Sequence, residues 1–571
     1  IVLAKPWRVM AEYRMYRYNR AMRRARTFEE WAAAAAALDR EAGNDAWRAA
    51  DESSDYDWQL VTRTTEHLRR LREEGGDVHD ILLTLRTVLN RNFGGLGNQK
   101  LYARAHVGTK LAVEAAQREV AACLQHVADS DRLTFSDKAA FFASAKKALG
   151  RSALCLSGGG ALSMGHLGVV RSLIEAGAMP PVVSGTSGGS IGAAMLAFNT
   201  DKEMLEEVCQ PDISNKHGVR WFKPVHKQVM SFASTFLSQQ GARMMENEDF
   251  ANTCRAYYGS ITFEEAYQRT GRMVSITITV ASRAAPRAAH PLVLNFLTAP
   301  TVLLWSAVAA SCALPGLMRP VTLMAKRRDG QETPYHPVGV QTLDGSVHSD
   351  IPSEALAQLM NVQRFVVSQV NPHVTPFLRQ TGAGANPRRN TIIQWCDSVD
   401  RYVNISIQAK LVKLAKLRLI PRLFGVEIGN IVLQRYRGHI TITPYLSIFD
   451  QFKALSHPSE EDMRVYLLQG ERATWPAVAA VKGLLALEQA VDAVARRFPY
   501  ATRVTSPPPR TSPPKRVGGA EAEGGDDGRA AGGAGVGGAG AGDAGSSTVR
   551  VLPVPSRRPR LRTPMVDPMS G

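Results

Sequence analysis

Residues 153–197 read ALCLSGGGALSMGHLGVVRSLIEAGAMPPVVSGTSGGSIGAAMLA, and their pattern is the strongest indication of the fold class. A short apolar run, a glycine cluster and a segment with helical spacing follow one another, and the same series then repeats. A strand that ends in a glycine turn and leads into a helix is the unit of an α/β protein with a parallel sheet. Further strands are predicted at 274–280 (VSITITV) and 364–370 (RFVVSQV). We therefore expect an α/β fold with a central, mainly parallel sheet in three layers.

The segments that flank this core differ from it in composition. Residues 27–148 have apolar positions at helical spacing, and residues 381–500 read as mainly helical with a possible strand at 439–443. The Pro- and Gly-rich end of the chain cannot bury enough apolar surface to offset its ordering entropy. We predict five parts: a basic arm (1–26), a helical N-terminal domain (27–148), an α/β domain (149–380), a helical C-terminal extension (381–500) and a disordered tail (501–571).

Composition excludes several classes of protein. Of 571 residues, 44% are hydrophobic and 21% are charged, which is typical of a globular chain and not of a disordered, collagen-like or multi-span membrane protein. The net charge of +17 favours an anionic partner, either nucleic acid or a phospholipid surface. The six cysteines form no CxxC pair, so we expect no metal site and no disulfide framework, and a reduced, intracellular protein.

Two segments have features of membrane-binding or membrane-spanning sequences. Residues 5–26 carry eight basic residues against one acid, which suits either a helix on an anionic surface or a solvated helix. Residues 291–318 lack charge and are long enough to span a bilayer, but they contain Asn295, Pro300 and Pro315. We interpret them as a buried strand, loop and helix. The chain begins at Ile1, so we expect a fragment or a processed product.

The first chemical motif is the glycine cluster Gly158-Gly159-Gly160-Ala161, between a predicted strand and a helix. Glycines let the backbone approach a bound group, and the N–H groups at a helix N-terminus favour an anion. A phosphate loop would need GK[ST] after the glycines, and a dinucleotide fingerprint would need glycine where Ser163 stands. The cluster alone therefore indicates an anion-binding loop of unspecified purpose.

The second motif is Gly185-Thr-Ser-Gly-Gly189, which matches G-x-S-x-G with Ser187 at its centre. In a nucleophile elbow, a sharp turn from strand to helix exposes the serine hydroxyl, and the flanking glycines avoid clashes within the turn. An apolar run precedes the motif and a helix-like segment follows it. This context predicts that Ser187 is a nucleophile.

The third motif is Asp344-Gly345. A serine hydroxyl is a poor nucleophile until a base removes its proton, and a carboxylate beside a glycine turn could do so directly. Alone, an Asp-Gly pair indicates only a turn. The pair indicates a catalytic base only in combination with the other two motifs.

In this order the three motifs resemble those of the patatin-like phospholipase family, over residues 150–372. The resemblance implies a Ser–Asp catalytic dyad, with Ser187 as nucleophile and Asp344 as base. It also implies that the N–H groups of the glycine loop (Gly158, Gly159, Gly160 and Ala161) form an oxyanion hole. Neither a metal nor a cofactor is implied. His166 and His373 are the candidates if a full Ser-His-Asp triad operates instead.

A narrower resemblance bears on the substrate. SALCLSGGGALSMGHLGVVRSLIEAG (152–177), LNFLTAPTVLLWSAVAASCALPGLM (294–318) and the helical segment that includes LRTVLNRNFGGLGN (85–98) are similar to triacylglycerol lipases of plant oil bodies and yeast lipid droplets. This implies hydrolysis of neutral lipid to fatty acid, by a protein peripherally bound to the phospholipid monolayer of a lipid droplet on its cytosolic side.

Three alternatives stay open. No residue distinguishes triacylglycerol from phospholipid, so a phospholipase A or lysophospholipid transacylase is the near alternative. A non-catalytic lipid-droplet scaffold is a second, although the intact motifs argue against it. Nucleic-acid binding would explain the positive charge, but no basic and aromatic recognition module is present.

Overall fold

The computed structural model describes most of the chain outside the C-terminal tail. The described residues are 6–216, 247–282, 290–313, 321–335, 340–344, 350–372, 374–375, 413, 422–423, 426–427, 436–445, 447, 450 and 453–499. The predicted tail, 501–571, and much of the predicted C-terminal extension therefore lie outside them.

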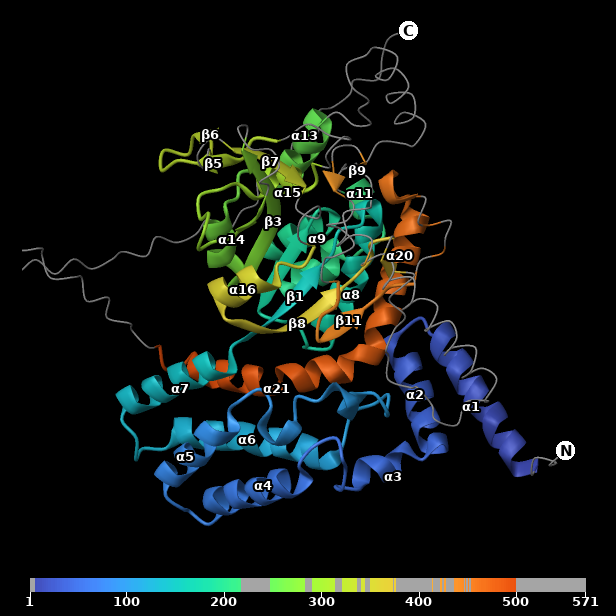
Figure 1. Ribbon diagram of the computed structural model, residues 1–571, viewed down its shortest axis with the longest axis vertical. Coiled ribbons are helices and arrows are strands. Elements are labelled where there is room, and N and C mark those ends of the chain that lie inside the picture. The colour runs from blue at the N-terminus through green and yellow to red at the C-terminus, as the bar shows by residue number, and fades with distance from the viewer. Residues whose placement is uncertain are drawn as a thin grey trace, which may run out of the picture. The chain divides into compact units, whose positions relative to one another are not determined.

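A seven-stranded sheet forms the centre of the fold (Figure 1). Its path runs β11-β8-β1-β2-β3-β4, and β7 also pairs with β3. The first five strands of the path are mutually parallel, whereas β4 and β7 run antiparallel to β3. The strands of this sheet are β1 (Arg151–Leu156), β2 (Val182–Thr186), β3 (Met273–Ser282), β4 (His290–Leu294), β7 (Val340–Asp344), β8 (Val362–Ser368) and β11 (Ile440–Ile442). The mainly parallel sheet and the strands expected at 274–280, 364–370 and 439–443 are confirmed.

Two small antiparallel pairs complete the strands. They are β5 (Met324–Lys326) with β6 (Glu332–Pro334), and β9 (Arg422–Leu423) with β10 (Val426–Glu427).

Most of the longer helices lie before and after the sheet strands in the chain. The α-helices are α1 (Pro6–Arg24), α2 (Phe28–Ala42), α3 (Asn44–Ala49), α4 (Trp58–Glu73), α5 (Val78–Val88), α6 (Leu111–Asp129), α7 (Phe135–Leu149), α8 (Gly165–Glu175), α9 (Gly188–Phe198), α10 (Asp201–Glu203), α11 (Ile213–Lys216), α13 (Asn247–Tyr258), α14 (Phe263–Thr270), α15 (Leu304–Ser311), α16 (Ser353–Met360), α20 (Glu460–Thr474) and α21 (Val478–Ala495). Short 3₁₀ or π turns are η1 (Phe93–Gly95), η2 (Gln99–Tyr102), η3 (Gly160–Met164), η4 (Met204–Val208), η7 (Lys453–Leu455) and η8 (Trp475–Ala477).

Both faces of the sheet are buried, as a parallel sheet requires. Alternate residues of β1 enter two different cores: Leu154 and Leu156 join α8, α9, α15 and α20, whereas Ala153 and Cys155 pack with α16. This division follows from the period of two along a strand. The arrangement is therefore three layers: helices, sheet and helix.

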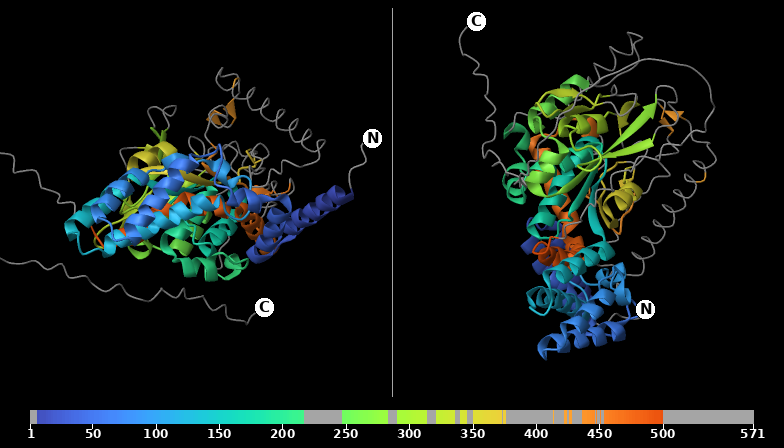
Figure 2. Two further views of the ribbon diagram at one scale, coloured as in Figure 1. Left: turned by 90° about the horizontal axis from the view of Figure 1, so that it is seen from below. Right: turned by 90° about the vertical axis from the view of Figure 1, so that its left-hand side faces the viewer.

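Helix α21 joins the N-terminal helices to the sheet. It packs against α6 and α7, and Figures 1 and 2 show it running between α6 and the strands. On α21, the carboxylate of Glu488 accepts hydrogen bonds from Ser152 at the start of β1 and from Arg91 of the N-terminal region. Chain segments almost 400 residues apart are thus connected through one side chain.

The uncharged segment 291–318 forms a strand, a loop and a helix over its described part. Strand β4 and helix α15 account for it, and Leu304, Val308 and Ala310 are fully buried in the core. The prediction for this segment is confirmed as far as residue 313. Among the described residues, no helix has both the length and the apolar character needed to cross a membrane.

Candidate active site

Ser187 occupies a sharp turn between β2 and α9. Its φ of 51° and ψ of −128° place a residue with a side chain where glycine is usual. The flanking glycines have no room for a methyl group. A Cβ on Gly189 would lie 2.3 Å from the carbonyl oxygen of Leu156, and one on Gly185 would lie 2.5 Å from that of Gly189. This is the geometry that the G-x-S-x-G motif predicts.

Hydrogen bonds hold the turn in this strained conformation. The N–H of Ser187 donates to the Ser311 hydroxyl (2.9 Å), which donates in turn to the carbonyl of Thr277 on β3 (2.6 Å). The Ser190 hydroxyl donates to the carbonyl of Ser187 (2.6 Å). Strained residues persist where the surroundings over-determine them, and such residues concentrate at functional sites.

The glycine loop lies directly against this turn. A Cβ on Gly188 would approach the carbonyl oxygen of Gly160 to 2.7 Å and the Ser163 hydroxyl to 2.6 Å. Gly159 and Gly160 have φ values of 154° and 58°, which favour glycine. The structure therefore brings the first two predicted motifs together, with their backbones in contact.

The register of β3 brings Asp344 to the same place. Thr186, just before Ser187, pairs with Thr277, and Asp344 pairs with the next residue, Ile278. Strand β4 occupies one edge of β3 beside both positions, so β2 and β7 must share the opposite edge. Since β2 runs parallel to β3 and β7 runs antiparallel, the carboxyl ends of β2 and β7 face each other. Asp344 thus ends its strand where the serine turn begins. Gly345 lies outside the described residues, and the dyad itself stays a prediction.

Sequence reasoning did not assign a role to Asp350, which is fully buried beside the glycine loop. One carboxylate oxygen accepts the N–H of Gly158 (2.8 Å), and the other accepts the side-chain amides of Gln369 (3.0 Å) and Asn371 (2.9 Å). Its carbonyl accepts the hydroxyl of Thr186 (3.0 Å). Asp350 therefore ties the loop, β2 and the end of β8 together. Its only sequence signal is its place six residues after Asp344.

The contact with Asp350 changes the role expected for Gly158. We predicted its N–H among the oxyanion donors, but this N–H points to the Asp350 carboxylate. A donor engaged by a buried carboxylate positions the loop instead of binding substrate. The oxyanion role stays a prediction for Gly159, Gly160 and Ala161.

His166 is a buried structural link. Its Nε2 lies 3.0 Å from the carbonyl oxygen of Ser157 and its Nδ1 lies 2.7 Å from the Ser368 hydroxyl. Burial lowers the pKa of His166 to about 4, so the ring is neutral at pH 7. These contacts connect the loop to β8 and place neither ring nitrogen on Ser187. His373 lies outside the described residues.

The Asp350 carboxylate predicts a pH dependence of turnover. Burial raises its pKa from 3.8 to about 6, against the opposing effect of its three hydrogen-bond donors. The charged form that accepts the Gly158 N–H is therefore lost as the pH falls through about 6. We expect kcat on a soluble ester to fall about tenfold between pH 7 and pH 5. The measurement is kcat from pH 4.5 to pH 8.

The variant Asp350→Asn is expected to have a lower kcat and no limb near pH 6, because it has no proton to gain there. Glu354→Gln, on the exposed surface of α16, is the matched control and should keep the wild-type profile. If kcat of Asp350→Asn still fell between pH 7 and pH 5 as in the wild type, the titrating group would be one other than Asp350.

Comparison with known families gives two matches. Residues 8–147 match a domain of unknown function, DUF3336, and residues 154–357 match the family described as patatin-like phospholipase. The second match contains Ser187, the glycine loop and Asp344.

Curated fungal proteins resemble most of the chain. A patatin-like phospholipase domain-containing protein of Cryptococcus neoformans is 35% identical over 83% of this chain and 54% of its own length. One from Meyerozyma guilliermondii is 34% identical over 88% of this chain and 70% of its own length. The chain spans about half the length of the two Cryptococcus relatives.

Among solved structures, the crystal structure of VipD from Legionella pneumophila aligns with 61% of this chain and 67% of its own. The TM-score is 0.25 and the sequence identity is 12%, too low to bear on the fold.

Proposed function

Because the chain belongs to the patatin-like phospholipase family, we propose that it hydrolyses lipid esters through Ser187. The observation that carries the proposal is the strained Ser187 turn, in backbone contact with the glycine loop and facing the end of the strand that carries Asp344. A nucleophile, a base and backbone donors are the parts that acyl transfer needs.

The proposed mechanism has two acyl-transfer steps. Asp344 accepts the proton of the Ser187 hydroxyl as its oxygen attacks the ester carbonyl, and N–H groups of the glycine loop stabilise the oxyanion. The carbon–oxygen bond then breaks, and the leaving alcohol takes the proton from Asp344. Water attacks the acyl-enzyme while Asp344 accepts its proton. The bond between the acyl carbon and the Ser187 oxygen then breaks, Asp344 returns the proton to that oxygen, and the fatty acid leaves.

We further propose triacylglycerol at a lipid droplet as the substrate. This finer proposal rests on the resemblance of residues 85–98, 152–177 and 294–318 to lipases of oil bodies and lipid droplets. Phospholipid is the second candidate, because the fungal relatives are named for a phospholipase domain.

The test is release of fatty acid from emulsified triolein and from phosphatidylcholine vesicles, by the wild-type protein and by Ser187→Ala. Triolein hydrolysis that Ser187→Ala abolishes would support the lipase. Hydrolysis of phosphatidylcholine alone would make phospholipid the substrate instead of triacylglycerol, with the same acyl-transfer mechanism. Release from neither would favour the non-catalytic scaffold.

Helix α1 supports binding to a lipid surface. Its inner side packs on α2, where Met15 is buried and Arg14 pairs with Glu41 at 2.8 Å. Its outer side exposes Met10 (55%), Tyr13 (57%) and Tyr16 (61%). Exposed arginines accompany them at positions 17, 20, 23 and 24. Aromatic rings beside arginines are typical of a helix that lies on an anionic interface.

Neutralising α1 is expected to weaken adsorption to anionic lipid. We expect the variant with Arg17, Arg20 and Arg23 all changed to Gln to bind vesicles of phosphatidylcholine and phosphatidylserine roughly 100-fold less tightly, at about 1 kcal/mol per arginine. The difference should shrink at high salt, because ions screen the attraction. Vesicle co-sedimentation measures it.

The matched control changes three exposed arginines elsewhere, Arg63, Arg70 and Arg118, to Gln. An equal loss in this control would show that net charge alone drives adsorption. Unchanged binding of the α1 variant would dismiss the helix as the lipid contact.

A further inference from the structure

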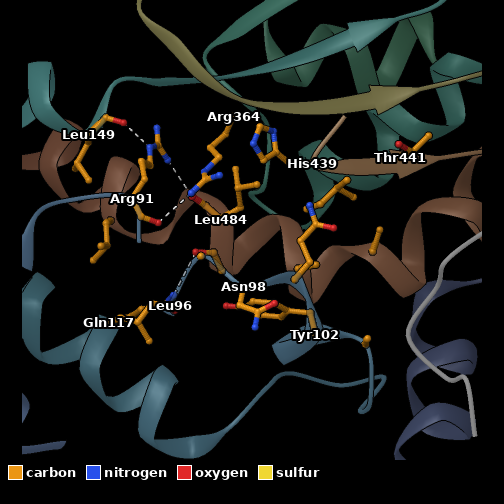
Figure 3. Close-up of a pocket in the computed structure, with 18 of the residues that line it drawn as sticks. Arg91, Leu96, Asn98, Tyr102, Gln117, Leu149, Arg364, His439, Thr441 and Leu484 are labelled. Atoms are coloured by element: carbon orange, nitrogen blue, oxygen red, sulfur yellow. Dashed lines mark hydrogen bonds between the residues drawn. The ribbon is translucent and has the colours of Figure 1, made fainter. Parts of the chain in front are cut away.

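A cavity of about 140 Å³ lies where three distant segments of the chain meet (Figure 3). One wall is the N-terminal segment from 90 to 103, the second is formed by Arg364 of β8 with residues 439–441, and the third is the start of α21. Arg364 pairs with Ser152 in the sheet, whereas Leu156 pairs with Gly185 just before the serine turn. At about 3.3 Å per residue, the cavity and the turn are roughly 13 Å or more apart along the strands. The cavity is therefore separate from the candidate active site.

Two arginines among the described residues line this cavity, and their charges are compensated differently. Arg91 pairs with Glu488 at 2.9 Å and also donates to the carbonyls of Leu149, Gly150 and Leu484. Arg364 donates to the backbone carbonyl of Arg91 (3.1 Å), and within the described part of the chain no carboxylate forms an ion pair with it. Figure 3 shows its side chain extending between Arg91 and His439.

Arg364 is half-buried, so its uncompensated charge is costly. Burial and the neighbouring Arg91 both lower the pKa of Arg364, which shows that its surroundings disfavour the cation. A buried or partly buried charge is normally paired. An anion in the cavity would supply the missing partner, and a guanidinium binds a planar carboxylate through two parallel hydrogen bonds.

The rest of the cavity wall has a different character. Leu96, Ala480, Leu484 and Leu487 line it and are all half-buried, so each exposes apolar surface toward the cavity. An inorganic anion would leave this surface in contact with water. A ligand with an anionic head and an alkyl chain would cover both parts of the wall.

We propose that this cavity binds a fatty acid, with the carboxylate on Arg364 and the first methylene groups against Leu96, Leu484 and Leu487. The volume agrees with this, because an engineered cavity of about 150 Å³ holds benzene, a ligand of six carbons. Fatty acid is also the product of the proposed reaction, but binding here requires no hydrolysis. The ligand bridges the N-terminal segment, β8 and α21, so its binding stabilises their association.

The first test locates the bound ligand. The full chain is incubated with an eight-carbon carboxylic acid that carries a diazirine on its alkyl chain, illuminated, digested and mapped by mass spectrometry. We expect labelled peptides from 90–103 or from α21, and competition by octanoate but not by octanol. Label confined to the peptide that carries Ser187 would overturn the proposal.

The second test is octanoate binding by calorimetry. Arg364→Gln is expected to raise the dissociation constant for octanoate roughly tenfold or more, because it removes a charged hydrogen-bond donor. Arg118→Gln, an exposed arginine on α6 outside the cavity wall, is the matched control and should bind as the wild type does. Equal affinity in wild type and Arg364→Gln would overturn the proposal.

Two further measurements separate the possible failures. Turnover of 4-nitrophenyl acetate by Arg364→Gln should equal that of wild type. This measurement distinguishes loss of ligand binding in the cavity from loss of catalysis at Ser187. Octyl phosphate binding more tightly than octanoate would overturn the carboxylate assignment in favour of a phosphate head. If Arg364→Gln fails to fold, the labelled position in the wild-type protein decides the question.

Discussion

Ser187→Ala is expected to reduce kcat on a soluble ester by at least about 10,000-fold, the scale seen when a serine hydrolase loses its nucleophile. The reason is chemical, since no acyl-enzyme can form without the hydroxyl. The free energy of unfolding should hardly change, because alanine keeps the Cβ that serine already places at a φ of 51°. The measurements are kcat by release of a chromophore and unfolding by urea.

The control for this variant is Ser144→Ala, an exposed serine on α7 that should keep full activity. A fluorophosphonate probe adds an independent reading, because it should label wild type and Ser144→Ala but not Ser187→Ala. Turnover or labelling retained without Ser187 would remove this serine from the chemistry.

Glu488→Ala is expected to lower the free energy of unfolding by about 3–5 kcal/mol, as the loss of one partner of a buried ion pair does. The Glu488 side chain is 5% exposed and that of Arg91 is 10% exposed. Truncation would leave the Arg91 charge buried without its acid and would remove the acceptor of the Ser152 N–H (3.0 Å) and hydroxyl (2.6 Å). Urea unfolding of the full chain measures the change.

The matched control is Asp492→Ala, one turn further along the same helix. Asp492 pairs with Lys146 at 2.7 Å, but the two side chains are 28% and 43% exposed. Such a surface pair contributes at most about 1 kcal/mol. Similar losses in the two variants would mean that Glu488 acts through helix propensity or net charge, and not through the buried contact.

Much of the α/β core is predictable because its signals are local. The series of strand, glycine turn and helix occupies consecutive residues, and the segment 153–197 contains this series twice. The elbow is predictable for the same reason: the turn at Ser187 needs glycine at 185 and 189 wherever the rest of the chain lies. The strands at 274–280 and 364–370 follow from their own composition.

The role of Asp350 was not predictable, and neither was the hydrogen bond that the N–H of Gly158, predicted as an oxyanion donor, gives to its carboxylate. The contact between them joins residues 192 positions apart, and no local pattern marks an acceptor for one N–H of a glycine loop. Likewise, the approach of Asp344 to the serine turn follows from the register of two strands on one edge of β3.

Local patterns in the chain were therefore sufficient for the α/β class, the order of the motifs and the conformation of Ser187, because turns, periods and glycine requirements act within a few residues. The compensation of charges, by contrast, follows from contacts between distant segments. Arg91 finds its acid 397 residues away on α21, whereas Arg364 beside it has no acid partner among the described residues. The physical reason is that ion pairing in a folded chain depends on which surfaces pack together, and packing is a property of the whole chain.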